Sequence, residues 1–342
     1  MQYATLGNTG LIVSRLAFGA LTFTQGNTSL PSVYKVGEKL ANELVARALD
    51  AGVNFFDTAD VYADGESETL LGAALRPHRN HVVIATKVGN RASRQILDSG
   101  LSRRHILRSV DESLRRLGTD WIDVYIAHRE DPSTPLEETL YAFDAVVRAG
   151  KVRYIGFSNW SAWQAAAALE IQKAAGLARF CHGQMYYSLL GRDVEREMVP
   201  MMRRYGLGMT VWGPLAFGFL GGAYTRESLS RPDNRFSNFD MLKFDREKGF
   251  ALLDLMRSIA AERSIAVAQV ALAWLLARPV VTSVLLGATR MQQLEENLNA
   301  VDVVLTPEDI ARLDAATAPP PVFPDGTQMD RLTARALAGT LK

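Results

Sequence analysis

Cysteine is almost absent from this sequence, because Cys181 is the only one among 342 residues. A single cysteine excludes an internal disulfide, and a chain of this length can bury a large core without cross-links. Neither sign of charge is in excess, since 38 Lys and Arg residues against 37 Asp and Glu residues leave a formal net charge of +1. This balance implies no nucleic-acid partner. We expect Cys181 to be a small core residue in a protein of the reducing cytoplasm.

Long apolar runs are also lacking. Residues 1–7 show neither the basic start nor the unbroken apolar stretch of a signal peptide, and the apolar stretch 267–277 is too short to span a bilayer. His78 and His81 lie near each other, but no carboxylate or thiol cluster accompanies them. We therefore predict a cytoplasmic protein with no membrane partner and no metal site.

Short β-branched or aromatic runs alternate with longer helical patterns along most of the chain. After an opening hairpin with Gly7 and Gly10 in its turns, the expected strands are 16–19, 54–57, 82–87, 123–127, 152–157, 181–185, 209–212 and 283–286. The expected helices between them include 41–51, 103–117, 136–149, 162–175, 195–205 and 267–277, and 291–299 follows the last strand.

Strict alternation of strands and helices predicts a parallel sheet with right-handed crossovers, and eight repeats are the number that closes a barrel. The alternative is an open, doubly wound sheet, which usually carries a Gly-x-Gly-x-x-Gly turn after its first strand. No such turn follows any of the expected strands. We therefore predict an α/β fold, a (β/α)₈ TIM barrel with an N-terminal β-hairpin, as one domain over residues 1–342.

Two polar, turn-rich stretches interrupt this rhythm, residues 22–39 after the first barrel strand and residues 226–248 after the seventh. In a barrel, both would lie at the rim formed by the carboxyl ends of the strands. We predict that they act as lids over a site.

Four residues of catalytic type lie at or just after strand ends. Asp57 ends the second expected strand, Tyr62 follows in the next loop, Lys87 ends the third strand and His128 follows the fourth. Because these strand ends converge on one face of a barrel, the four side chains are expected to share a pocket.

The types of these residues suggest proton transfer. Lys87 and Asp57 on neighbouring strands can form a buried ion pair, since an unpaired buried charge is costly. A nearby ammonium favours the phenolate of Tyr62, whose ordinary pKa is about 10, and this brings proton transfer within reach. His128 can hydrogen-bond the same substrate oxygen and share its developing charge.

Each of these residues has a structural interpretation when it is taken alone. Asp57 could cap a helix or join a core ion pair, and Lys87 could be a solvated rim residue. His128 could be a satisfied buried histidine, and Tyr62 could serve packing only. The four together, each after an apolar run, favour a catalytic site.

The stretch GVNFFDTADVY at 52–62, followed by Glu66-Ser67-Glu68 and Leu71-Gly72, resembles the signature of aldo-keto reductases. The similarity continues through Lys87, His128 and GKVRYIGFSN at 150–159, and it runs from Tyr3 to about Leu313. Several motifs in the right order are far more specific than any one of them. The resemblance implies a (β/α)₈ barrel, a catalytic tetrad matched by Asp57, Tyr62, Lys87 and His128, and reversible reduction of carbonyl compounds with a nicotinamide cofactor.

The resemblance also implies a cofactor site at the barrel mouth. Ser158, Asn159 and Gln184 match the family's polar groups on the carboxamide, and Trp212 matches the ring that stacks on the nicotinamide. A glycine-rich loop at 213–222 resembles the one that covers the pyrophosphate, and 287–297 resembles the adenosine segment. The implied cofactor-binding residues are Gly19, Ala20, Leu21, Asp57, Ser158, Asn159, Gln184, Trp212, Gly213, Pro214, Leu215, Gly218, Gly287, Thr289, Arg290, Gln293, Glu296 and Asn297.

Arg290 favours NADP over NAD, because a guanidinium at that position can grip a 2′-phosphate with two hydrogen bonds. The alternative is a solvated arginine at a helix start. The cofactor residues also have structural alternatives. Trp212 could be a core residue, and Gln184 could be a polar residue of the barrel interior.

The expected substrate is a small carbonyl compound or alcohol, held by Tyr62 and His128 and by walls made of Phe23, Trp160 and Phe217. These aromatic residues suggest an apolar or aromatic substrate. The alternative function is a cofactor-binding regulatory subunit, since the chain also resembles the β-subunits of voltage-gated potassium channels. The sequence indicates neither the physiological substrate nor an oligomeric state.

Overall fold

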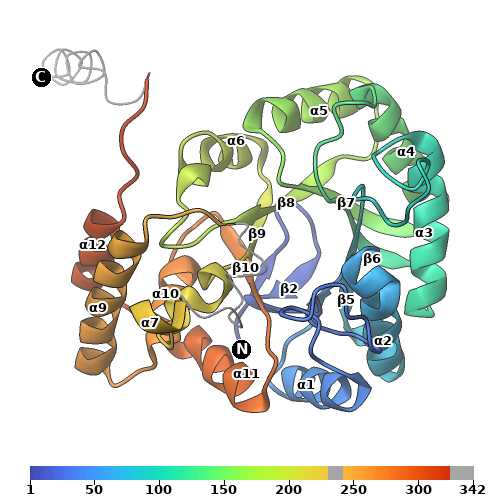
Figure 1. The fold of residues 1–342 in the computed structure, drawn as a ribbon. Helices are drawn as coiled ribbons and strands as arrows, with labels where there is room; N and C mark the ends of the chain where they lie inside the picture. The colour runs from blue at the N-terminus through green and yellow to red at the C-terminus, as the bar shows by residue number, and fades with distance from the viewer. Residues whose placement is uncertain (230–241, 324–342) are drawn as a thin grey trace, which may run out of the picture.

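Eight parallel strands close into a barrel in the computed structural model, which describes residues 1–229 and 242–323 (Figure 1). The strand order around the barrel is β10-β3-β4-β5-β6-β7-β8-β9. The predicted TIM barrel is therefore confirmed. The strands are β3 (Leu16–Gly19), β4 (Phe55–Asp57), β5 (Val83–Val88), β6 (Ile122–Ala127), β7 (Val152–Ser158), β8 (Phe180–Tyr186), β9 (Gly208–Trp212) and β10 (Val281–Leu286).

The N-terminal hairpin closes one end of the barrel. Strands β1 (Tyr3–Thr5) and β2 (Ile12–Ser14) pair antiparallel, as predicted. Leu6 and Val13 are fully buried and belong to the same apolar cluster as barrel residues such as Phe55. Gly7 has φ +59°, and a Cβ there would collide with the backbone of Cys181. The opposite end of the barrel, at the carboxyl ends of the strands, remains for a site.

Helices form the outer layer around the strands (Figure 1). They are α1 (Glu38–Asp50), α2 (Glu66–Leu75), α3 (Arg103–Leu117), α4 (Leu136–Arg148), α5 (Ala162–Ala174), α6 (Met198–Tyr205), α7 (Arg226–Leu229), α9 (Arg246–Arg263), α10 (Val267–Leu276), α11 (Met291–Leu298) and α12 (Pro307–Ala316). No single helix in the described ranges is long and apolar enough to cross a membrane, and α9 with α10 passes that test only as a pair bent by 92°.

Local sequence signals set the helix ends. In α3, the Ser102 side chain accepts a hydrogen bond from the backbone N–H of His105, and Gly118 ends the helix in the left-handed conformation. Helices α2, α9 and α12 are not among the helices named from the periodicity.

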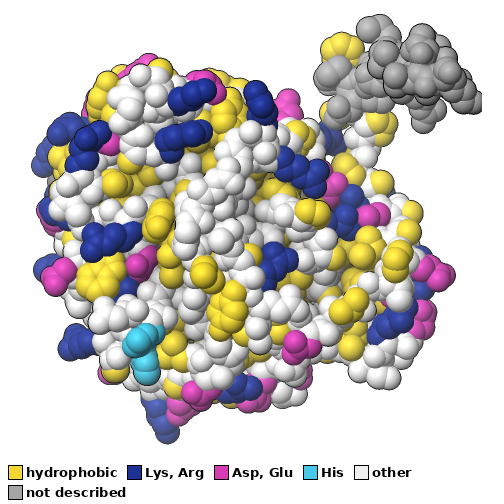
Figure 2. All heavy atoms as spheres, turned by 180° about the vertical axis from the view of Figure 1, so that it is seen from behind, with side chains coloured by type: hydrophobic (Ala, Val, Ile, Leu, Met, Phe, Trp, Pro, Cys, Tyr) yellow, Lys and Arg dark blue, Asp and Glu magenta, His cyan; other side chains and the backbone are white. Residues whose placement is uncertain are grey.

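Two apolar layers surround the strands. Along β6, Val124 and Ile126 join the cluster inside the barrel, whereas Tyr125 and Ala127 join the cluster under the helices. This alternation is the period of a β-strand whose two faces are both buried. On the outer surface seen in Figure 2, Lys and Arg side chains mix with Asp and Glu side chains, as the balanced composition leads one to expect.

The first excursion, residues 22–39, is fastened to the rim. A bridge joins Phe23 to Val36, and the Glu66 carboxylate accepts hydrogen bonds from the Thr24 hydroxyl (2.8 Å) and the Gln25 backbone N–H (2.6 Å). The second excursion begins as α7 and ends inside α9, and its residues 230–241 lie outside the described part of the chain. The predicted lid role of both stretches stays a prediction.

Candidate active site

Neighbouring strands bring the four expected catalytic residues to the same end of the barrel. Asp57 ends β4, Lys87 lies one residue before the end of β5, and His128 directly follows β6. Tyr62 begins the short 3₁₀ helix η1 (Tyr62–Gly65) after β4. Because β4 pairs with β5 and β5 pairs with β6, these side chains lie close together at one end of the barrel.

Lys87 is the centre of this group, and its side chain is fully buried. Its Nζ donates to Asp57 Oδ1 (2.6 Å), to the Thr58 carbonyl oxygen (2.6 Å) and to the Tyr62 hydroxyl oxygen (3.2 Å). A lysine ammonium has three N–H groups, so every donor has an acceptor. Burial lowers the pKa of Lys87, but Asp57 and Tyr62 together raise it by more. The net pKa of Lys87 therefore lies above its ordinary value. Lys87 is therefore an ammonium at neutral pH.

The net pKa shift of Tyr62 is upward, which is opposite to the lowering expected from the neighbouring Lys87 ammonium. Burial raises the pKa of the phenol, Lys87 lowers it by less, and the net pKa lies above its ordinary value. The phenol is therefore protonated at neutral pH. Because Lys87 donates to the phenol oxygen, the phenol hydrogen points to another acceptor.

His128 lies beside Tyr62, with ring centroids 5.8 Å apart and planes at 80°. Burial lowers the pKa of His128 well below its ordinary value, and the positive charges of Lys87 and Arg129 add to this effect. The imidazole is therefore neutral at physiological pH. A neutral imidazole can still donate one N–H to a carbonyl oxygen.

The backbone after Tyr62 is strained. Ala63 (φ 49°), Asp64 (φ 55°) and Gly65 (φ +90°) adopt the left-handed conformation one after another. A Cβ at Gly65 would lie 2.6 Å from Cδ of Arg116. Non-glycine residues in this conformation cost of order 1 kcal/mol each and occur preferentially at functional sites. The sequence analysis did not predict this turn, although Asp64-Gly65 is a dipeptide that is common in turns.

Thr58 and Ser67 support the site in a way that sequence reasoning missed. The Thr58 hydroxyl lies 2.8 Å from the Ser67 hydroxyl, and Ser67 Oγ donates to the Ala20 carbonyl (2.7 Å). Both side chains are fully buried. This chain of hydrogen bonds fixes the residue whose carbonyl accepts from Lys87. Both residues lie in the family-like stretch, but neither is of catalytic type.

A second group of polar residues lies on the β7–β9 side of the mouth. Ser158 pairs with Gln184 in register, and Asn159 donates to the Ser158 hydroxyl (2.9 Å) and the His128 carbonyl (3.2 Å). Trp212 Nε1 donates to the Asn159 side-chain oxygen (3.0 Å). The structure thus brings together all the residues expected at the carboxamide.

Gln184 connects the two groups, because its Nε2 donates to Asp57 Oδ2 (2.8 Å). Its amide oxygen and the hydroxyl hydrogen of Ser158 have no partner among the described residues. The Trp212 indole is half-buried and packs at 5.1 Å against the ring of Tyr186, a neighbour that the sequence did not indicate. An aromatic face beside a free acceptor and a free donor fits a nicotinamide with its carboxamide.

The expected phosphate and adenosine segments also lie at this end. Residues 213–222 form a turn and the 3₁₀ helix η4 (Ala216–Gly221), with Gly213 (φ +65°) and Gly218 (φ +96°) in the left-handed region. Gly287 faces open space, since a Cβ there would meet nothing within 4 Å. Pro214 is buried, and Leu215 is half-buried.

Around the start of α11, some side chains already have hydrogen-bond partners or are buried, and the Arg290 side chain does not. Gln293 accepts from the Thr289 backbone N–H (3.1 Å), the Glu296 carboxylate accepts from Gln292 (2.8 Å) and Asn297 is buried. Arg290 is exposed at the N-cap of α11, and its side chain has no hydrogen bond or ion pair with the described residues. Arg290 is therefore available for an anion. At the end of β3, Gly19 and Leu21 are half-buried. The backbone N–H of Ala20 donates a hydrogen bond to the Asp57 carbonyl oxygen (2.8 Å).

The three aromatic residues expected to line the substrate pocket differ in their burial. Phe23 is fully buried and packs on Phe18 at 5.7 Å. Trp160 is 3% exposed and packs on Phe180 at 5.5 Å. Phe217 is half-buried and lies 6.1 Å from Trp212. Of the three, Phe217 is the one that is not buried, because the rings of Phe23 and Trp160 pack into the core.

The remaining residues of interest lie away from this chemistry. Across residues 1–229 and 242–323, no group of three or more His, Cys, Asp or Glu residues could hold a metal ion. Burial raises the pKa of the Cys181 thiol to about 12, so this side chain is a core residue and not a thiolate.

Comparison with known proteins adds a family to this geometry. The pattern of the Aldo/keto reductase family matches residues 15–318. The chain is 38% identical to a probable voltage-gated potassium channel subunit beta of Oryza sativa subsp. japonica, over 94% of this chain and 98% of the relative. It is 34% identical to versiconal hemiacetal acetate reductase of Aspergillus parasiticus, over 95% and 99%. It is 36% identical to the uncharacterized oxidoreductase YrpG of Bacillus subtilis (strain 168), over 92% and 95%.

Proposed function

The chain belongs to the aldo/keto reductase family, and we propose that it is an NADP-dependent enzyme that reduces aldehydes or ketones to alcohols, reversibly, with Tyr62 as the acid. Membership of this family and the similarity to oxidoreductases support carbonyl reduction in general. The observation that carries the proposed mechanism is the hydrogen bond from the buried Lys87 ammonium to the Tyr62 phenol.

In this mechanism, Ser158, Asn159, Gln184 and Trp212 would hold a nicotinamide, which would supply the hydride for the carbonyl carbon. Tyr62 donates its proton to the carbonyl oxygen, and the phenolate that results is stabilised by Lys87 at 3.2 Å. Neutral His128 orients the carbonyl oxygen through a hydrogen bond and shares its developing negative charge. Asp57 keeps Lys87 charged and in place, so it acts on the reaction through the lysine. In alcohol oxidation, the same groups work in reverse.

The preference for NADP rests on Arg290. Its side chain is exposed at the start of an eight-residue helix and is free of described partners. A free guanidinium beside a helix N-terminus suits a phosphate monoester, because both supply N–H donors and positive potential. Gly287, Thr289 and Gln293 around it are proposed to contact the adenosine part.

The test of the mechanism is Tyr62→Phe. This variant removes the proton donor and keeps the ring, so turnover of a reactive aldehyde should fall by about 10²- to 10⁴-fold. NADPH binding, followed by quenching of tryptophan fluorescence, should remain within about twofold of the wild type. Undiminished turnover would refute the role of Tyr62.

A second function is suggested by the names of two relatives, each called a probable voltage-gated potassium channel subunit beta, in Oryza sativa subsp. japonica and Arabidopsis thaliana. In that case the chain would bind NADPH tightly and regulate a partner without substantial turnover. Steady-state NADPH consumption with a broad panel of aldehydes and ketones separates the two functions. Turnover at ordinary enzymatic rates favours the reductase, and tight binding without turnover favours the regulator.

A further inference from the structure

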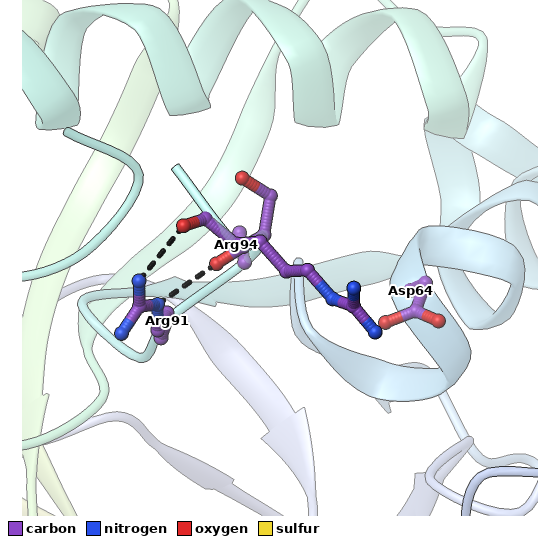
Figure 3. A pocket seen from close by; sticks show the side chains of 5 residues that line it. Asp64, Arg91 and Arg94 are labelled. Atoms are coloured by element: carbon purple, nitrogen blue, oxygen red, sulfur yellow. Dashed lines mark hydrogen bonds between the residues drawn. The ribbon is translucent and has the colours of Figure 1, made fainter. Parts of the chain in front are cut away.

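A cavity of about 730 Å³ opens beside the strained turn that follows Tyr62 (Figure 3). It is lined by Asp64, Arg91, Ala92, Ser93 and Arg94, which we call the arginine pocket. Asp64 lies two residues after Tyr62, so their α-carbons are at most about 7 Å apart. The other residues belong to the loop that leaves β5 shortly after Lys87. The lining of the arginine pocket therefore comes from the two segments that directly follow Tyr62 and β5, and β5 lies across the barrel from β9, which carries Trp212.

The two guanidinium groups of the pocket differ in their hydrogen bonding. Arg91 is anchored, because its Nε donates to the Ser93 carbonyl (3.0 Å) and its Nη2 donates to the Arg94 carbonyl (2.8 Å). These bonds leave Nη1 of Arg91 without a partner in the described ranges. The Arg94 side chain extends toward Asp64 in Figure 3, but no hydrogen bond or ion pair joins that side chain to any residue within the described ranges. Both arginines are exposed, so both can meet a ligand.

Asp64 opposes these charges only in part. Its Oδ2 accepts a hydrogen bond from Asn27 Nδ2 at 2.7 Å, which also ties the turn to the excursion at 22–39. Two guanidinium groups against one carboxylate leave the pocket with a net positive charge. Guanidinium groups bind carboxylates in a planar, paired geometry that neutral groups do not match.

We propose that the arginine pocket binds the carboxylate of a carbonyl substrate whose reacting group lies at Tyr62. The inference rests on the proposed reductase function and assigns its substrate class, an aldehyde or ketone that also carries a carboxylate. It differs from the apolar or aromatic substrate suggested by Phe23, Trp160 and Phe217, of which Phe23 and Trp160 pack in the core. Selectivity then comes from charge at the rim and not from an aromatic slot.

A matched pair of substrates tests this inference, 4-formylbenzoate and its neutral methyl ester. The wild type should show a higher kcat/KM for the acid than for the ester. Arg94→Gln should lower kcat/KM for the acid by about three- to tenfold, mostly through KM, and should leave the ester within about twofold. Asp64→Asn should raise kcat/KM for the acid, because it removes the repulsive charge.

The control is Arg115→Gln, which removes an exposed positive charge from the far end of α3 and should change neither substrate. Raising the salt concentration should reduce the preference for the acid in the wild type, since exposed charges are screened. A preference for the acid that is absent, or unchanged in Arg94→Gln, overturns the inference.

Calorimetric titration of 4-formylbenzoate into wild-type protein and Arg94→Gln gives a readout that does not require turnover. Weaker binding to the variant supports the arginine pocket even if neither aldehyde is reduced, and in that case only the proposed function fails. Equal binding to both proteins overturns the pocket whatever the turnover.

Discussion

The Nζ of Lys87 lies 3.2 Å from the Tyr62 hydroxyl oxygen and donates its two other N–H groups to Asp57 and to the Thr58 carbonyl. This arrangement bears on where the phenol hydrogen can go. The lysine occupies a lone pair of the phenol oxygen, so the phenol hydrogen is left for a substrate. After the phenol has given up that hydrogen, the same ammonium faces the phenolate.

Lys87→Met should therefore affect both activity and stability. Loss of the ammonium removes the charge that stabilises the phenolate, and kcat for aldehyde reduction should fall by at least about 100-fold. Loss of one partner also leaves Asp57 buried without its counter-charge, which typically costs about 3–5 kcal/mol. The measurements are steady-state kinetics and urea unfolding at pH 7.

The double variant Asp57→Asn/Lys87→Met is the control for this prediction. It removes both charges, so it should regain much of the unfolding free energy lost in Lys87→Met while remaining inactive. If Lys87→Met is as stable as the wild type, the ion pair contributes nothing to folding and our account of it is wrong.

The pH dependence of reduction follows from the directions of the pKa shifts. The pKa values of Tyr62 and Lys87 lie above their ordinary values, and that of His128 lies well below its ordinary value. Reduction needs a protonated phenol, so its rate should be flat from pH 6 to 9 and fall only near or above the ordinary phenol pKa of about 10. A fall in kcat for reduction between pH 6 and 8 would contradict this assignment.

The barrel could be predicted from sequence because each strand is a short apolar run bounded by glycine or by a long helical pattern. All eight expected strands coincide with β3 to β10 within a few residues. Helix α12 escaped that reasoning although Thr306 and Asp309 form a capping box at its start. Helix α2 escaped it because η1 and α2 follow one another without a loop, so the turn and the helix share one motif.

The site was predictable in membership but not in its electrostatics. The Asp57–Lys87 pair followed from two polar residues at neighbouring buried strand ends. The net direction of the Tyr62 pKa did not follow, because it depends on how completely the fold removes water around the phenol. The burial of Trp160 depends on packing against residues distant in sequence, such as Phe180, which no local pattern indicates.

Arg290→Gln tests the preference for NADP. If Arg290 grips the 2′-phosphate, its loss should raise KM for NADPH by about tenfold and leave KM for NADH nearly unchanged. The measurement is initial rates with both cofactors at a saturating aldehyde concentration, and Arg115→Gln is the matched control. Equal effects on NADPH and NADH would show that Arg290 does not discriminate between them.

His182 should make the protein sensitive to acid. Its side chain is fully buried on β8, and neither ring nitrogen has a hydrogen-bond partner among the described residues. A Cβ on Gly156, its register partner on β7, would collide with the imidazole, so the ring is tightly enclosed. Burial, aided by the charge of Lys87, lowers the pKa of His182 to about 3.

The sign follows from proton binding. Unfolded His182, with an ordinary pKa of about 6.5, binds a proton below that pH, whereas the folded protein keeps the ring neutral down to about pH 3. The free energy of unfolding should therefore fall as pH falls, and His182 alone should account for about 2.5 kcal/mol between pH 7 and 4.5. Urea unfolding at the two pH values should show a correspondingly smaller loss in His182→Leu. His78→Gln, which changes an exposed histidine, should behave as the wild type, and an equal loss in His182→Leu would show that His182 does not stay neutral in the fold.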